Sequence, residues 1–380
     1  MKLPYLTADL PGIGGQLKST PEDFIVEEVP LYAPGGEGQH VYVWIEKRGL
    51  STFSAVKIIA RALGVSPAAI GYAGLKDAHA VTRQMLSIDG VSEADVERLA
   101  LENINILQVS RHRNKIKIGH LAGNRFVIRV RNVGPEAQAV AEQILSILTR
   151  RGAPNYFGEQ RFGMRNNSHR LGEALVRRDG QAFVQEYLGR PQPGDSEQLY
   201  EARRLVDEGR LAEALQIWPP PLRDEYRVLR AVVSKGAEAA VILKALPPQL
   251  KNLFISAYQS HLFNQLLAQR IATLDRLEDG DVAYIHGKGA SFLVESAQTE
   301  QPRADRFEIS PSGPLFGPKT LLAEKAPGRR EREVLARQGL TLDDFKLPGS
   351  KVRGGRRPYR LKIKQPQVWW DEGLVVSFEL

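Results

Sequence analysis

The 380-residue sequence contains no cysteine. This absence excludes disulfide bonds, thiolate metal ligands, iron–sulfur clusters and a cysteine nucleophile. It also fits a reducing compartment, so we expect a cytoplasmic location. The seven histidines lie far apart in the sequence, with no pair at metal-ligand spacing. We therefore expect neither a metal site nor a cofactor.

Long apolar runs are missing as well. No uninterrupted apolar stretch approaches the roughly 18 residues that a membrane span needs, so we expect no contact with a membrane. The N-terminal residues MKLPY lack the apolar core of a signal peptide. Lys and Arg outnumber Asp and Glu by 52 to 44, for a net charge of +8. That excess is modest, but its clustering along the chain indicates a polyanionic partner.

The first part of the chain alternates strand and helix patterns. Residues 23–29 and 40–46 have strand composition, and helices are expected to begin near 51, 92 and 135. Two alternating runs, 115–118 and 126–131, predict a hairpin whose non-apolar face is cationic. This order of elements predicts an α+β fold in which helices back a mixed or antiparallel sheet.

From about residue 168 the pattern becomes mainly helical. The longest predicted helix covers residues 249–271, and strand patterns return only beyond Arg356. The simplest topology is a β-rich domain interrupted by a helical insertion, with the end of the chain completing the first sheet. We therefore expect one domain made of residues 1–175 and 356–380, and a second made of residues 176–355.

One short segment carries most of the chemical information. Residues 71–84 read GYAGLKDAHAVTRQ, which places Asp77 among Lys76, His79 and Arg83. The glycines before the acid allow a tight turn and a close approach to a ligand. From the local pattern alone, Asp77 is either a helix cap, a paired surface acid or part of a reactive site.

This segment resembles the AGxKD-x-x-AVT(R/E)Q signature of the TruD family of tRNA pseudouridine synthases. Further segments resemble family motifs in the same order along nearly the whole chain. They are Lys18 with PEDF at 21–24 and Glu28, NYFGEQRFG at 155–163, SAYQSHLFN at 256–264, GPLFGP at 313–318 and RRP at 356–358. The resemblance implies a pseudouridine synthase catalytic domain interrupted by a mainly helical TRUD insertion domain.

The resemblance also implies the reaction, which is isomerisation of uridine to pseudouridine in tRNA at position 13. The glycosidic C–N bond breaks and a C–C bond forms at C5 of the uracil, without a metal, a cosubstrate or a net redox change. One carboxylate is sufficient, acting as a nucleophile or as a base near the ribose. The family's nucleophilic aspartate falls at Asp77.

The same motifs imply a set of substrate-binding residues: Lys18, Phe24, Asn155 and Phe157. Lys18 is the expected cationic partner of Asp77, because a nearby cation keeps a carboxylate ionised. Lys76 and Arg83 are candidates by spacing, but they fit phosphate contacts or solvated charges equally well. Outside their motifs, the two phenylalanines would be ordinary core residues and Asn155 a turn residue.

Two clusters of basic residues indicate where the RNA backbone binds. A cationic run is often just a solvated face, but here both runs lie in the expected catalytic domain. The residues chosen as RNA contacts are Arg111, Arg113, Arg129, Arg131, Arg356 and Arg357. We expect tRNA as the partner of a monomeric protein.

One departure from the family keeps a second hypothesis open. Family members continue past the last strand into a Leu-Pro-x-Gly-Ser-aromatic segment, whereas this sequence ends at Leu380. The alternative is a catalytically silent RNA-binding protein derived from the family. A third hypothesis, an RNA methyltransferase, lacks the expected strand followed by a Gly-rich loop for its cofactor.

Overall fold

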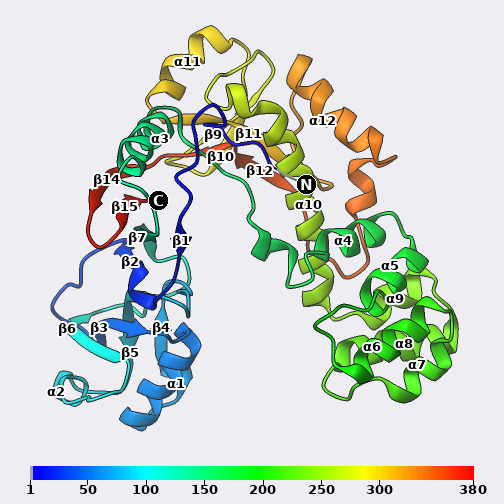
Figure 1. Cartoon of the computed structure of the whole chain (residues 1–380), viewed down its shortest axis with the longest axis horizontal. Helices are drawn as coiled ribbons and strands as arrows, with labels where there is room; N and C mark the ends of the chain where they lie inside the picture. Colours follow the sequence, from blue (N-terminus) through cyan, green and yellow to red (C-terminus); the bar gives the residue numbers. More distant parts are fainter. Residues whose placement is uncertain (1–2) are drawn as a thin grey trace. The chain divides into compact units, whose positions relative to one another are not determined.

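The computed structural model describes residues 3–380, which form two compact units (Figure 1). Met1 and Lys2, which begin the MKLPY segment considered above, lie outside the described residues. The sheet unit comprises Thr7–Ala153 and Leu361–Leu380, and the helical unit comprises Pro154–Arg360 with the residues up to Leu6. The boundaries at 175 and 356 concern independently folding domains and stay a prediction.

A mixed nine-stranded sheet forms the sheet unit. The strand order along its main path is β14, β15, β7, β2, β5, β3, β6, while β1 pairs with β7 and β4 with β5. The bounds are β1 Gln16–Leu17, β2 Phe24–Pro30, β3 His40–Arg48, β4 Ile70–Tyr72, β5 Val81–Ile88, β6 Ile104–His112, β7 Leu121–Arg131, β14 Lys364–Trp370 and β15 Leu374–Glu379. Only β2 and β5 run parallel; the other pairs in this sheet are antiparallel.

The C-terminal strand completes the N-terminal sheet, as the sequence predicts. β15 pairs with β7 in a continuous register from Leu374 opposite Val130 to Glu379 opposite Arg125, and the two strands lie side by side in Figure 1. This pairing confirms the α+β topology in which the two ends of the chain share one sheet.

Helices cover this sheet where their apolar faces require it. Helix α1, Thr52–Leu63, begins because the Ser51 side chain accepts the amide of Ser54, and it ends at Gly64 with φ 67°. Its buried positions, including Ile59, join the strand residues Val43 and Leu86 in one core. Helices α2, Glu93–Glu97, and α3, Ala137–Arg151, complete the unit.

The predicted hairpin is wrong. Residues 115–118 form a loop, and β7 pairs with β2 and β15 rather than with this segment. Ile116 is buried and its amide donates to Ser87 Oγ at 2.9 Å, whereas Ile118 is 80% exposed. Ile116 therefore anchors a loop. The alternation of Lys and Ile resembles a strand, but Ile118 is solvated, so the two isoleucines do not form a common buried face.

The helical unit contains helices α4 to α12 and a four-stranded antiparallel sheet in the order β10, β9, β11, β12. The helix bounds are α4 Ser168–Val176, α5 Gly180–Leu188, α6 Glu197–Asp207, α7 Leu211–Ile217, α8 Arg223–Lys235, α9 Ala239–Ala245, α10 Pro248–Arg270, α11 Ala297–Asp305 and α12 Lys325–Arg337. The strands are β9 Val282–Ile285, β10 Ala290–Leu293, β11 Ile309–Leu315 and β12 Gly355–Pro358. Short strands β8, Ala153–Pro154, and β13, Arg360–Leu361, lie where the chain passes between the units.

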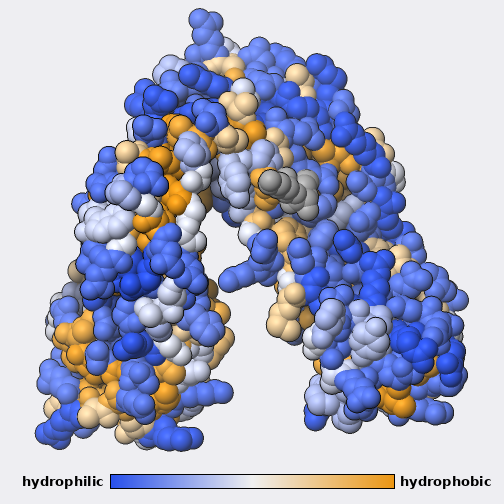
Figure 2. All heavy atoms as spheres, viewed as in Figure 1, coloured by the Kyte–Doolittle hydropathy of each residue, from blue (hydrophilic) through white to orange (hydrophobic). Residues whose placement is uncertain are grey.

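The long helix α10 is the centre of the helical unit. It starts with a proline in its first turn, where the missing amide costs no hydrogen bond. The helix has buried residues on several of its faces, among them Phe254, Tyr258 and Phe263. They share one core with residues of α4, α5 and α8. None of the helices in residues 3–380 is long and apolar enough to cross a membrane. On the face drawn in Figure 2, hydrophilic residues cover most of the surface.

Candidate active site

Asp77 lies in the loop of residues 73–80, which joins β4 to β5. Two hydrogen bonds hold the backbone of this loop. The Lys76 amide donates to Thr52 Oγ1 at 2.9 Å, and Lys47 Nζ donates to the Asp77 carbonyl at 3.0 Å. Lys47 also donates to the Leu50 carbonyl. Burial of Lys47 lowers its pKa to about 8, although the charge of Asp77 partly opposes this shift. The loop is therefore fixed through its backbone, which leaves the Asp77 carboxylate available.

The Asp77 carboxylate is held in its ionised form by its neighbours. Lys18 Nζ lies 2.7 Å from Oδ2, and the His79 amide donates to Oδ1 at 3.3 Å. Partial burial on its own would raise the pKa of Asp77, but Lys18 and the amides of His79 and Ala78 outweigh it and lower this pKa below its ordinary value. About a third of each side chain is exposed, 36% for Lys18 and 31% for Asp77. The expected ion pair is thus present and reachable from solvent.

An aromatic group adjoins this ion pair. Lys18 Nζ lies 4.0 Å from the ring centroid of Phe24, the first residue of β2. The Phe24 ring lies 6.3 Å from that of Phe126, which in turn stacks on Phe378 of β15 at 5.5 Å. Because Phe24 is only partly buried, its ring combines a packed side with an accessible one. Three strands distant in sequence therefore supply one aromatic row beside Asp77.

The other two cations of the signature have different partners. Lys76 Nζ lies 2.8 Å from Glu28 Oε2, and both side chains are almost completely buried. Arg83 of β5 pairs with Glu46 of β3 at 2.9 Å. Neither side chain is paired with the Asp77 carboxylate, so Lys18 is the cation that holds it.

Asn155 and Phe157 lie in the helical unit, in the segment that leads to the 3-10 turn Glu159–Phe162. The Asn155 side chain donates to the Pro358 carbonyl at 2.9 Å and accepts from Arg357. Arg357 also lies over the Phe157 ring, 4.1 Å from its centroid. The side chain of Asn264 bonds to both backbone groups of Phe157, at 2.9 Å each. The NYFGEQRFG segment is thus fixed in place by SAYQSHLFN and by the RRP segment.

The arginines of the sheet unit that the sequence predicts as RNA contacts are paired with acids. Arg131 makes a two-pronged contact with the fully buried Asp23 at 2.9 Å, and Arg129 lies 3.7 Å from the same carboxylate. Arg129 also pairs with Asp371. Arg111 pairs with Glu93 at 3.1 Å and Arg113 with Glu37. Arg129 and Arg131 therefore neutralise the buried carboxylate of Asp23, and only their remaining N–H groups could contact a phosphate.

The two arginines of the late cluster have different surroundings. The Arg356 side chain is 3% exposed, pairs with the buried Glu331 at 2.8 Å and donates to Ser312 Oγ at 3.0 Å. Moving Arg356 to a phosphate would leave Glu331 buried and unpaired, so this pairing disfavours the predicted RNA contact. Burial lowers the pKa of the partly buried Arg357.

Some residues around Asp77 carry no sequence signal of their role. Lys47 lies on an alternating strand where a solvent-facing lysine would look the same, and Glu28 is a motif residue with no role assigned from the sequence. Among residues 3–380 we find no group of three or more His, Asp or Glu side chains that could hold a metal ion. The carboxylate of Asp77, the ammonium of Lys18 and the ring of Phe24 lie together in the sheet unit.

Known proteins of one family match this chain over nearly its whole length. The family profile described as tRNA pseudouridine synthase D (TruD) matches residues 1–380. A tRNA pseudouridine synthase D from Syntrophotalea carbinolica is 47% identical over 95% of this chain and 91% of its own length. One from Geobacter metallireducens is 46% identical over 99% of this chain and 94% of its own length.

A solved structure shows the same fold. The crystal structure of a Methanosarcina mazei protein assigned as tRNA pseudouridine synthase D (TruD) superposes with a TM-score of 0.88 at 30% sequence identity. The match covers 100% of this chain and 95% of the other. The chain belongs to the tRNA pseudouridine synthase D (TruD) family.

Proposed function

We propose that this protein isomerises uridine 13 of tRNA to pseudouridine, with Asp77 as the reacting carboxylate. Family membership over the whole chain supports the class of reaction and the tRNA substrate. The single observation that carries the assignment of Asp77 is its geometry: an ionised, partly exposed carboxylate, 2.7 Å from Lys18, on a loop fixed through its backbone.

The reaction makes specific demands on such a carboxylate. The bond between C1′ and N1 breaks, the uracil turns, C1′ joins C5, and the proton leaving C5 is balanced by one gained at N1. Ionised Asp77 acts either as a nucleophile at C1′ or as a base at C2′. Both routes require a deprotonated carboxylate, and Lys18 favours this form by lowering the pKa of Asp77.

The other residues implied by the family motifs have supporting roles in this proposal. Phe24 offers a ring on which the extracted uridine can stack, because enzymes that react with a base first remove it from the RNA stack. Asn155 is 4% exposed and uses one donor and one acceptor of its amide within the protein. In this proposal its second N–H or second lone pair contacts the uracil edge or the ribose. Phe157 is proposed as a second ring of the substrate site.

The experiment uses unmodified tRNA transcripts and maps pseudouridine by chemical derivatisation. Wild-type protein should produce one modified position, 13, and a transcript with cytidine at that position should stay unmodified. Asp77→Asn should abolish turnover while tRNA binding and thermal stability remain within about twofold and a few degrees. Asp9→Asn, an exposed acid in the same unit, is the matched control and should be fully active.

Two outcomes would overturn the proposal. Comparable pseudouridine formation by Asp77→Asn would exclude Asp77 as the reacting group, and modification at another position would exclude uridine 13. Binding of tRNA by the wild-type protein without any pseudouridine would instead support the silent RNA-binding alternative, which the comparisons do not favour. A monomer acting on tRNA in the cytoplasm completes the proposal, and light scattering of the free protein tests the monomer.

A further inference from the structure

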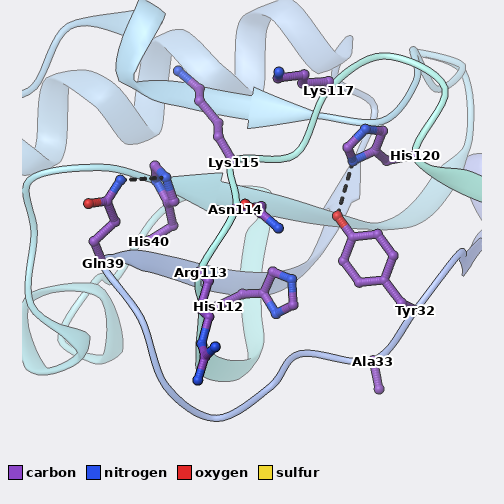
Figure 3. Close-up of a pocket in the computed structure, with 10 residues that line it drawn as sticks. All are labelled: Tyr32, Ala33, Gln39, His40, His112, Arg113, Asn114, Lys115, Lys117 and His120. Atoms are coloured by element: carbon purple, nitrogen blue, oxygen red, sulfur yellow. Dashed lines mark hydrogen bonds between the residues drawn. The ribbon is translucent and has the colours of Figure 1, made fainter.

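A pocket of about 560 Å³ opens in the sheet unit (Figure 3). Its walls come from residues 32–40, which lead into β3, and from residues 112–120, which follow β6. The side chains used below are Tyr32, His112, Arg113, Lys115, Lys117 and His120. No Asp or Glu lines the pocket. Its volume lies in the range of small-ligand sites.

The aromatic rings of the pocket are fixed in place. Tyr32 stacks on His112 with ring centroids 5.0 Å apart and planes at 24°. The Tyr32 hydroxyl is hydrogen-bonded to His120 Nδ1 at 3.0 Å, the contact drawn as a dashed line in Figure 3. The Gly35 amide donates to His112 Nδ1 at 3.0 Å, so in the neutral imidazole Nε2 carries the proton. A preformed flat surface with a hydrogen-bond donor at its edge results.

The charges of the pocket are positive and only partly neutralised. Arg113 pairs with Glu37, and Lys115 donates to the Ala68 carbonyl, which does not cancel its charge. Lys117 is exposed, and among the described residues no carboxylate pairs with it or with Lys115. A ring pair beside uncompensated lysines suits a planar base attached to a phosphate.

The pocket is connected to the loop that carries Asp77. The Gly119 amide donates to the Ala73 carbonyl at 2.8 Å. A Cβ on Gly71 would approach the Ile116 carbonyl to 2.3 Å, so only glycine allows these two segments to lie so close. Residues 112–120 and the Asp77 loop are therefore packed backbone to backbone in one unit. RNA bound at the pocket would have a fixed spacing from the Asp77 carboxylate.

We propose that this pocket binds a nucleotide of the tRNA other than the one isomerised, with its base on the Tyr32–His112 ring pair and its phosphate at Lys115 and Lys117. This inference rests on the proposed function, because it takes tRNA as the substrate. The pocket acts as a second point of attachment that sets which uridine reaches Asp77. Stacking on aromatic rings tolerates any base, so the pocket positions the RNA by its backbone and shape.

The test measures binding of fluorescent unmodified tRNA in the Asp77→Asn background, where no turnover occurs. Tyr32→Ala should weaken binding about tenfold, whereas Tyr32→Phe, which keeps the ring, should stay within about twofold of the parent. Lys115→Ala/Lys117→Ala should weaken binding by a similar factor and lower the salt slope by roughly 1 to 2. Lys57→Ala, an exposed lysine on α1 of the same unit, should change neither quantity.

A second experiment distinguishes binding of RNA from binding of a free nucleotide. It also tests this inference independently of the proposed function. Photocrosslinking of 4-thiouridine tRNA should label the peptide that contains Tyr32, and millimolar AMP should not abolish the label. Unchanged affinity in both Tyr32→Ala and the double lysine variant would overturn the proposal, as would binding of AMP at the pocket with no effect on tRNA. Because binding needs no turnover, a protein that fails to isomerise uridine still tests the pocket.

Discussion

The buried ion pair between Lys76 and Glu28 should decide whether the Asp77 loop folds. Lys76 Nζ lies 2.8 Å from Glu28 Oε2, with side chains 3% and 1% exposed. Glu28 Oε1 also accepts the Met85 amide of β5 at 3.4 Å. Lys76→Met removes the ammonium and leaves an uncompensated carboxylate inside the sheet. Such a change costs about 3–5 kcal/mol in the free energy of unfolding.

The double variant identifies the cause of that loss. Glu28→Gln/Lys76→Met replaces both charges by neutral groups of similar shape, so it should recover most of the stability, to within about 1 kcal/mol of wild type. Glu28→Gln alone should be as harmful as Lys76→Met, because it leaves the ammonium buried. The coupling energy of the cycle should therefore be several kcal/mol.

Urea unfolding and hydrogen exchange measure these effects. With a slope of about 2–3 kcal/mol per molar urea, each single variant should lower the unfolding midpoint by about 1–2 M. Exchange should accelerate first in peptides of β2 and of the loop of residues 73–80, which the pair connects. Single variants that each cost less than about 1 kcal/mol, or a cycle that is additive, would refute the reasoning. A stable double variant without turnover would give Lys76 a role at Asp77 beyond this ion pair.

Three further predictions concern other parts of the molecule. Lys18→Met removes the cation that lowers the pKa of Asp77, so this pKa rises and the acid limb of the kcat/KM profile should lie at higher pH than in wild type; identical acid limbs would contradict this. Stability should change by only about 1 kcal/mol, because the pair is partly exposed. Arg131→Ala should cost about 3 kcal/mol in a thermal or urea melt because it leaves Asp23 buried without its two-pronged partner, whereas the exposed Arg98→Ala should be neutral. Limited proteolysis should cut first near the crossovers between the sheet unit and the helical unit at residues 153–154 and 360–361 and leave a protected helical fragment; fragments that are cut evenly throughout would argue against separable domains.

The sequence alone determined the family, most of the order of elements and the choice of Asp77 as the proposed reacting carboxylate. Signals of this kind are local: a cap at Ser51, a proline at the start of α10, and motifs that keep their order along the chain. The resemblance placed Lys18 beside Asp77 although 59 residues separate them, and the structure has the two side chains in contact.

The partners of the charged residues were decided only by the tertiary structure. Lys47, Lys76 and Arg356 look like solvated cations in the sequence, yet all three are buried and bonded. Which face of a strand lies inside depends on its neighbours in the sheet, and those come from distant parts of the chain. For the same reason residues 115–118 read as a strand but form a loop, because Ile116 alone has a core to enter.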